Sequence, residues 1–546
     1  MNYTKFLMFI GCNMVVYSTM AQTNRRDSII PNQTIEITQV YKPEIAKVVK
    51  PEITPSLPKI ETTTPTFDYV VPQQTLSYSY HSVPIRPLAL GKQEYTYPFQ
   101  NYVKAGFGNL SSIYLDAGIG SLYGENYSST FHVSHLSQKK VNSQKGNSNT
   151  ELDASGKYEL SSHTLEGNLG FFRRGFKYYG YDQDLYQYGI NSIRQVFMGG
   201  NIDLSAENNK PNQLNINYKP EINIGLYGDR YDAVEQHLQI NLPASYTLDS
   251  NYKFSLGVKG NITTLRWNSI GEKNNFFQIN PAIDLTFKNI QARIALSPTL
   301  GKGNEWYFLP DLAFRTELFD KSFALVAGWK ADLIQNTYQE LSTKNPFMLN
   351  QYPTKQTKAD YVFGGFETKL GEHLTFGATA NWKQWENLAL FINDYALNTD
   401  GKQFETVYDQ KVQSVGLDAY FRYQISQVFG LNLESSWNSF YHTTTYDKVW
   451  QEPQIKFKAS LETRPIKNLS LSASVDYWDR MFAMQADGTS KKLPAFLDIG
   501  IQGEYQIIPR FSVFLQLNNI LNDKYQRWQQ YDNYGFNLLG GFRYKF

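Results

Sequence analysis

The chain has 546 residues, a formal net charge of +2 and 15% aromatic residues, so it lacks the strong basic excess of a nucleic-acid-binding protein. Its mean hydropathy is −0.45 and no run of about 18 apolar residues occurs, which excludes helical membrane spans. The 39 Tyr and 35 Phe are typical of the aromatic girdles that line both interfaces of a membrane β-barrel.

Residues 1–21 predict a secretory signal peptide. Lys5 precedes an apolar segment from Phe6 to Val16, and small residues lead to a cleavage site after Ala21. The alternative is a lipoprotein signal that ends at Cys12, which leaves a very short apolar core. Cys12 is the single cysteine, so cleavage after Ala21 removes it and leaves no thiol or disulfide chemistry in the mature protein.

Residues 22–98 contain ten of the 22 prolines. Proline removes a backbone donor and fixes φ, so we expect an extended segment with polyproline II character. A short repeat occurs at Lys42-Pro43-Glu44-Ile45 and Lys50-Pro51-Glu52-Ile53. Two interpretations stay open: a periplasmic linker, or a tether for a partner protein or a strap inside a barrel.

From about Tyr102 onward, apolar and polar residues alternate with a period of two, which predicts β-strands with one apolar face. In the last strand Phe536, Leu538 and Phe542 share one face, and the chain ends on Phe546. A soluble sandwich rarely runs this long, whereas a barrel in lipid turns apolar side chains outward and polar ones inward. Residues 99–546 therefore predict an all-β, antiparallel transmembrane barrel of about 22 strands, with 20 as the second choice.

Short and long connections alternate along this region. Short turns are expected at 124–126, 161–163, 249–251, 288–289, 319–322, 371–373, 467–468 and 509–510. Long loops are expected near 139–148, 178–191, 337–357, 387–403, 443–454, 480–494 and 522–534. Short turns lie in the periplasm in outer-membrane barrels, so an even strand count places both barrel ends there.

The end of the chain resembles the barrel of TonB-dependent receptors. Leu517 to Tyr525, with its Asn-Asp-Lys-Tyr segment, is similar to the family's penultimate strand, and Gly541 to Phe546 is similar to its last strand. The resemblance covers roughly residues 99–546 and implies a barrel of the bacterial outer membrane that binds or passes a solute. A strand count of about 22 is also typical of these transporters.

The N-terminal part departs from this family. Its members carry a plug domain in the lumen, but residues 22–98 are too few and too rich in proline to form one. Ile35, Glu36, Ile37 and Thr38 resemble the short strand through which such receptors contact TonB, and alternating β-branched residues are also common elsewhere. An empty lumen would leak, so we expect the proline-rich segment, inward loops or a partner protein to occupy it.

One loop is unusually rich in tyrosine. Tyr178, Tyr179, Tyr181, Tyr186 and Tyr188 are candidate contacts for a ligand or partner, because tyrosine offers a large surface and a polar tip. The alternative is an ordered loop beside an outer-rim girdle. Loops 337–357 and 387–403 carry Phe, Leu, Ile and Met, which indicates docking to a partner, folding inward over the pore, or packing of the loops on one another.

The ionisable residues give little indication of an enzyme. His132 shares a strand face with Ser128, Thr130 and Ser134, but a barrel lumen is rich in such residues. The histidine, cysteine and acidic residues lack metal-ligand spacing, so we expect no catalytic residue, metal or cofactor. The basic residues Lys139, Lys140 and Lys145 are candidate contacts for lipopolysaccharide phosphates, or a solvated loop.

We therefore predict a non-enzymatic outer-membrane barrel that resembles a TonB-dependent receptor without its plug and that passes or binds a solute. The alternative is a non-transporting subunit or scaffold of an outer-membrane assembly, which recruits a periplasmic partner through residues 22–98. Expected partners are outer-membrane lipid and lipopolysaccharide and a further protein; contact with TonB stays open.

Overall fold

The computed structural model describes residues 101–140, 144–210, 212–268, 270–319, 321–350, 354–396 and 399–546. The predicted signal peptide (1–21), the proline-rich segment (22–98) and the candidate TonB-contact strand Ile35–Thr38 lie outside these residues. The described residues belong to one of two compact units, Gly91–Phe546, and form almost entirely antiparallel strands.

The strands follow one another along the chain and most pair with their sequence neighbours. They are β1 (Tyr102–Gly108), β2 (Ser112–Tyr123), β3 (Tyr127–Lys139), β4 (Gly146–Glu159), β5 (His163–Lys177), β6 (Arg194–Asn208), β7 (Ile216–Tyr218), β8 (Glu221–Asp229), β9 (Val234–Thr247), β10 (Tyr252–Trp267), β11 (Ile270–Lys273), β12 (Phe276–Phe287), β13 (Ile290–Leu300), β14 (Trp306–Leu318), β15 (Phe323–Ile334), β16 (Thr357–Leu370), β17 (Leu374–Asn393), β18 (Phe404–Ile425), β19 (Phe429–Thr443), β20 (Ile455–Ile466), β21 (Leu469–Trp478), β22 (Phe482–Met484), β23 (Ser490–Lys492), β24 (Phe496–Ile508), β25 (Phe511–Asn518), β26 (Gln526–Trp528), β27 (Tyr531–Asp532) and β28 (Asn537–Lys545). The described helices are a short 3₁₀ turn, η1 (Lys302–Asn304), and α2 (Tyr338–Lys344).

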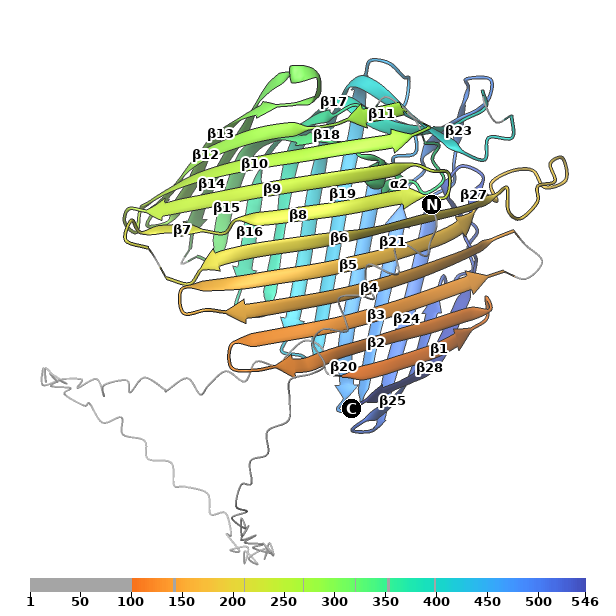
Figure 1. The fold of residues 1–546 in the computed structure, drawn as a ribbon, viewed down its shortest axis with the longest axis horizontal. Helices are drawn as coiled ribbons and strands as arrows, with labels where there is room; N and C mark the ends of the chain where they lie inside the picture. The colour runs from red at the N-terminus through yellow and green to blue at the C-terminus, as the bar shows by residue number, and fades with distance from the viewer. Residues whose placement is uncertain are drawn as a thin grey trace, which may run out of the picture. The chain divides into compact units, whose positions relative to one another are not determined.

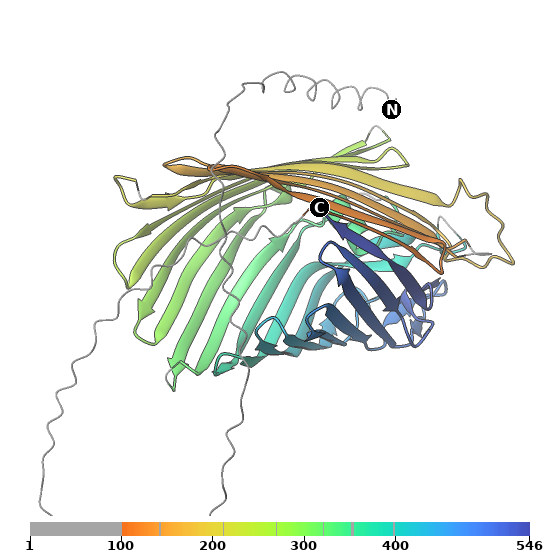
Figure 2. The ribbon, with the colours of Figure 1, turned by 90° about the horizontal axis from the view of Figure 1, so that it is seen from below.

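The main sheet closes into a ring, because β1 pairs with β28 from Tyr102 opposite Lys545 to Gly108 opposite Leu539. Figure 1 shows the two strands side by side, orange against dark blue, and Figure 2 shows the same ring from below. β7 and β8 both pair with β9 and form one strand interrupted near Pro220. With β11, β22, β23, β26 and β27 left out as parts of loop hairpins, the ring has 22 strands, so the predicted fold is confirmed.

The connections differ between the two rims. One rim, the turn rim, carries short connections and both barrel ends, where the backbone N–H of Phe546 donates to the carbonyl of Asn101 at 3.0 Å. The other, the loop rim, carries the long connections. The prediction of a loop at 387–403 is wrong in its first part, because β17 extends to Asn393. Its pairing with β18 continues on both sides of Asn387, although the φ of Asn387 is 56°.

The two faces of the strands differ in polarity. On β2, Ile113 and Leu115 are 52% and 40% exposed on the outer face, whereas Asp116 points inward to His132. Every backbone polar group in hydrocarbon requires a partner, and a closed ladder with an apolar outer surface supplies it. No helix in the described parts of the chain is long and apolar enough to cross a membrane.

Gly541 tests the closure of the ring. It lies opposite Gly106 across the β1–β28 seam, and a β-carbon there would overlap the carbonyl oxygen of Ala105. We expect Gly541→Val to destabilise the barrel by roughly 1–3 kcal/mol through overpacking and to reduce the fraction with heat-modifiable mobility in SDS gels. Gly156→Val in β4 is the matched control, since a β-carbon at Gly156 meets no atom within 4 Å. An equal loss of stability in both variants would contradict the pairing of β1 with β28.

Candidate functional site

The loop rim carries an aromatic core that begins on the inner wall of the barrel. Phe197 on β6 and Tyr227 on β8 are each 2% exposed and point inward. Helix α2, from the β15–β16 loop, covers them with Tyr338, whose ring centroid lies 5.6 Å from that of Tyr227 and 6.1 Å from that of Phe197. Figure 1 draws α2 behind β8 and β9, on the inner side of this wall.

The same core continues into the β17–β18 and β25–β28 connections. Trp528 of the β26–β27 hairpin packs between Phe391 of β17 and Phe404 of β18, with ring centroids 5.2 Å and 5.6 Å away. Phe347, which follows α2, stacks on Tyr531 at 3.5 Å between centroids. One buried cluster therefore includes side chains from all these segments.

These segments come from distant parts of the ring. Counted in ring order, β5 to β8 are the fifth to seventh strands, β15 to β18 the thirteenth to sixteenth, and β25 and β28 the last two. Side chains from such separate positions can share one core only if the loops extend across the mouth. We name this assembly the loop lid: residues 178–193, 335–350, 354–356, 388–396, 399–408 and 526–532.

Carboxylates on the barrel wall hold the N-terminal end of α2. Glu235 of β9 accepts hydrogen bonds from the backbone N–H groups of Tyr338 at 2.6 Å and Gln339 at 3.1 Å. Thr337 and Glu340 form a capping box, which fixes where the helix begins. Asp229 at the end of β8 accepts from the Tyr338 hydroxyl at 2.8 Å. Helix α2 is thus hydrogen-bonded to the wall as well as packed against it.

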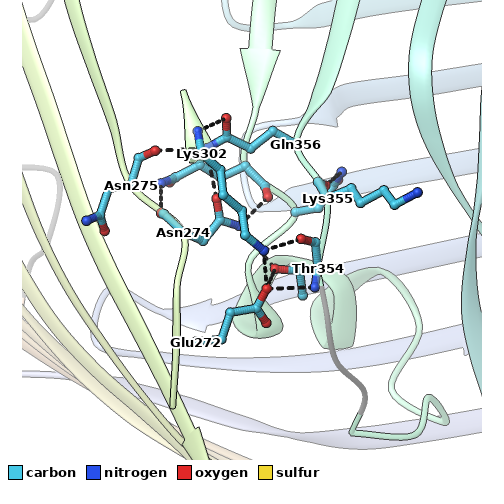
Figure 3. Close-up of polar contacts among 9 residues, drawn as sticks. Glu272, Asn274, Asn275, Lys302, Thr354, Lys355 and Gln356 are labelled. Atoms are coloured by element: carbon cyan, nitrogen blue, oxygen red, sulfur yellow. Dashed lines mark hydrogen bonds and ion pairs between the residues drawn. The ribbon is translucent and has the colours of Figure 1, made fainter. Parts of the chain in front are cut away.

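A polar clamp fastens both ends of the β15–β16 loop to the β10–β12 loop, as Figure 3 shows for its C-terminal end. Lys302 forms an ion pair with Glu272, and Glu272 accepts from the backbone N–H of Thr354 at 2.9 Å. Asn274 accepts from the Gln356 side chain at 2.8 Å. At the other end, Asn274 and Gln335 exchange side-chain-to-backbone hydrogen bonds at 2.7 and 2.6 Å.

Glu452, in the β19–β20 loop, links α2 to the surrounding loops. Its carboxylate lies 2.9 Å from Lys344 Nζ at the end of α2 and 3.5 Å from Lys456 Nζ. Burial opposes its ionisation, but Lys344, Lys456 and Arg527 outweigh burial and lower the pKa of Glu452 to about 2. The carboxylate therefore stays charged in moderately acidic solution while the lid is packed.

The tyrosine-rich loop lies largely inside the lid. Tyr178, Tyr179 and Tyr181 are buried, and Tyr186 and Tyr188 are partly exposed and stack on each other at 6.3 Å. The Tyr188 hydroxyl donates to Asp400 at 2.7 Å. Ligand or partner contact by this loop stays a prediction, for which Tyr186 and Tyr188 are the accessible members.

His132 lies on the inner wall between two carboxylates. Its Nε2 is 3.1 Å from Asp116 Oδ2 and its Nδ1 is 3.7 Å from Asp153 Oδ2. Within the residues that the structure describes, no group of three or more His, Cys, Asp or Glu side chains is arranged to hold a metal ion.

The site that the structure does assemble is the lid. Its wall anchors Glu235 and Asp229 were not predicted, and only the Thr337–Glu340 spacing was a usable sequence signal for α2.

No protein-family model and no curated protein matches the chain. Solved structures do. The siderophore receptor PirA from Acinetobacter baumannii has a TM-score of 0.62 at 9% identity, over 82% of this chain and 80% of that one. The FrpB iron transporter from Neisseria meningitidis scores 0.64 at 12% identity, over 82% of both chains. The ferripyoverdine receptor of Pseudomonas aeruginosa scores 0.61 at 10% identity, over 83% and 72%.

These similarities confirm the fold expected from the resemblance at the chain's C-terminal end. A closed ring of 22 strands with an apolar outer face is the architecture of outer-membrane receptor barrels. The chain is therefore a β-barrel of the bacterial outer membrane.

Acidification tests the role of Glu452 in the lid. The pKa of Glu452 is lower in the packed lid than its ordinary value of 4.5, so the charged carboxylate stabilises the lid at pH values above about 4.5. This stabilisation is lost as the pH falls toward about 2. We expect limited proteolysis of the loops to be about tenfold faster at pH 3 than at pH 6. The free energy of opening the lid then falls by the equivalent of about one pKa unit. Glu452→Gln should be cut readily at both pH values, with Glu434→Gln on the wall as the control. Unchanged pH dependence in Glu452→Gln would contradict this role.

Proposed function

We propose that the protein is a gated outer-membrane channel or receptor that binds or passes a solute, and that the loop lid is its gate on the loop side. The observation that carries this proposal is the aromatic core that joins distant arcs of the ring across the mouth. The wall below it is polar; one hollow of about 400 Å³ is lined by Arg422, Asn432, Glu434, Lys458 and Ser460. Such a lumen suits a hydrated solute.

The similar structures support uptake as the direction of transport, since they include a siderophore receptor and an iron transporter. In our proposal the barrel works without a separate plug domain and without enzymatic activity. The lid closes the loop-side mouth, and residues 22–98 or a partner protein occupy the periplasmic side. Ile35, Glu36, Ile37 and Thr38 are the candidate contacts through which TonB would supply energy.

Single-channel conductance of the purified barrel tests the gate. We expect the wild type to show low conductance with rare openings, and Phe391→Ala with Trp528→Ala to raise the open probability severalfold. Removing two buried aromatic rings leaves a cavity in the lid core, which destabilises that packing by several kcal/mol. The readout is current at fixed voltage in a planar bilayer.

The matched control is Trp306→Ala with Phe308→Ala. These rings are of the same kinds but are 62% and 60% exposed outside the barrel. The control should conduct as the wild type does, and heat-modifiable mobility should show that both variants are folded. A large, steady pore in the wild type would contradict closure of the mouth.

The second candidate is a scaffold subunit that recruits a periplasmic partner through residues 22–98. The repeated Lys-Pro-Glu-Ile motif supports it, because a proline-rich segment, which we expect to be extended, loses little conformational entropy when it binds a partner.

A pull-down in mild detergent separates the two candidates. The scaffold role predicts a stoichiometric partner that is lost when residues 22–98 are deleted, while the barrel remains folded. The channel role predicts solute flux through liposomes that hold the barrel alone. Absence of a stoichiometric partner, together with flux, would rule out the scaffold.

A further inference from the structure

The outer face of the barrel carries a row of cations at the loop rim. Lys139 of β3 lies opposite Gly146 of β4, and Lys177 of β5 lies opposite Arg194 of β6. Asn147 pairs with Phe176, so Gly146 and Lys177 are the next positions along β4 and β5. The four residues therefore form one line across four adjacent strands.

The row belongs to the lipid-facing side. Residues at every second position along β3 share a face, and Lys139 lies on the same face as Phe131, which is 42% exposed. Four positions below the row, His135, Thr150 and Arg173 form a second polar line, joined by a His135–Thr150 hydrogen bond of 2.8 Å.

The next line toward the membrane is apolar and consists of Val133, Leu152 and Phe171. Outward-facing side chains thus change from apolar to cationic within a few residues of the loop rim. This is the level at which outer-leaflet lipids expose their charged groups.

Within the described residues, Lys139, Arg173, Lys177 and Arg194 form no ion pair with a carboxylate. Lys177 is partly buried and lies near the like charges of Lys139 and Arg194.

The opposite side of the ring differs. Outward-facing Lys358 pairs there with Asp360 at 3.0 Å and Glu386 at 3.3 Å. Like charges held together without counter-charges indicate that an anion from outside the chain completes the patch on β3 to β6.

The position between the two lysines carries no side chain. It is the buried Gly146, which lies between Lys139 on β3 and Lys177 on β5. Lys139 and Lys177 stand two strand spacings apart, roughly 10 Å, on either side of this position. Two flexible cationic side chains can therefore converge on a phosphate between them, with Arg194 beside it.

The other lysines of the predicted basic run have a different role. Lys140 Nζ donates to the carbonyl of Tyr534 at 3.3 Å, and Lys145 Nζ donates to those of Asp532 at 3.3 Å and Asn533 at 3.0 Å. They fasten the β3–β4 loop to the β25–β28 loop. Of the three lysines predicted to meet lipopolysaccharide, Lys139 alone belongs to the outward row.

We propose that this outer face of β3 to β6 binds the phosphate groups of an outer-leaflet lipopolysaccharide molecule through Lys139, Arg173, Lys177 and Arg194. Its acyl chains lie on the apolar line beneath. A lipid that carries several phosphates beside acyl chains matches both parts of this surface. A free phosphate matches only the cationic part, and exposed lysines hold a single free ion weakly.

Binding of fluorescent lipopolysaccharide to the folded barrel in neutral detergent tests the proposal. The variant Lys139→Gln, Lys177→Gln, Arg194→Gln should bind about 100-fold more weakly than the wild type at low salt, since each cation near a phosphate contributes about a factor of five. The control is Lys210→Gln, Lys321→Gln, Lys467→Gln, which removes three exposed cations from the turn rim and should bind as the wild type does.

In further binding experiments the ligand is changed and the protein is kept. Dephosphorylated lipopolysaccharide should bind the wild type as weakly as intact lipopolysaccharide binds the triple variant. Equal affinity of the triple variant and the wild type overturns the proposal. Displacement by millimolar inorganic phosphate, or equally tight binding of phosphatidylglycerol, also overturns it, because the site would then take any anion or any anionic lipid.

Discussion

The structure depends on one constraint: in hydrocarbon every backbone N–H and C=O group needs a partner inside the protein. The chain meets it by pairing each strand with its neighbours and β1 with β28, so the sheet has no free edge. Side-chain alternation follows, since each strand turns one face to lipid and the other to the lumen. The pairing leaves both barrel ends at the turn rim and the long connections at the other.

A ring of this size creates a second problem, because 22 strands enclose more space than their inward side chains fill. The long loops address it on the loop side. They bring aromatic side chains from distant arcs into one core, and polar groups hold its edges: Glu235 and Asp229 at the start of α2, Glu452 at its end, and the Glu272–Lys302 pair at the base of the loop. Loops fixed by hydrogen bonds and ion pairs can be released by a ligand that competes for those partners, which is why we interpret the lid as a gate.

The barrel could be predicted from the sequence, because alternation is a local signal. Leu469 to Tyr477, for example, forms β21 as its alternation predicts, and the short turns at 288–289 and 467–468 mark strand ends correctly. The lid could not. Phe347 and Tyr531 are 184 positions apart and meet only because the ring brings their loops together. Asn387 illustrates a second limit, since β17 continues through this residue with a φ of 56° although polar and apolar residues mix there as in a loop. The apolar residues of loops 337–357 and 387–403 were recognised, but which of three roles they serve required the structure.

Loops from distant arcs of the ring meet across the mouth, and a pair of introduced cysteines can detect this contact. Phe347→Cys and Tyr531→Cys would be introduced together; the only native cysteine, Cys12, lies in the predicted signal peptide. After mild oxidation or treatment with a short bifunctional thiol reagent, we expect a link between the two positions in the folded barrel, detected by mass spectrometry of the digested protein. Two cysteines that label freely and do not link while the barrel stays folded would contradict the lid.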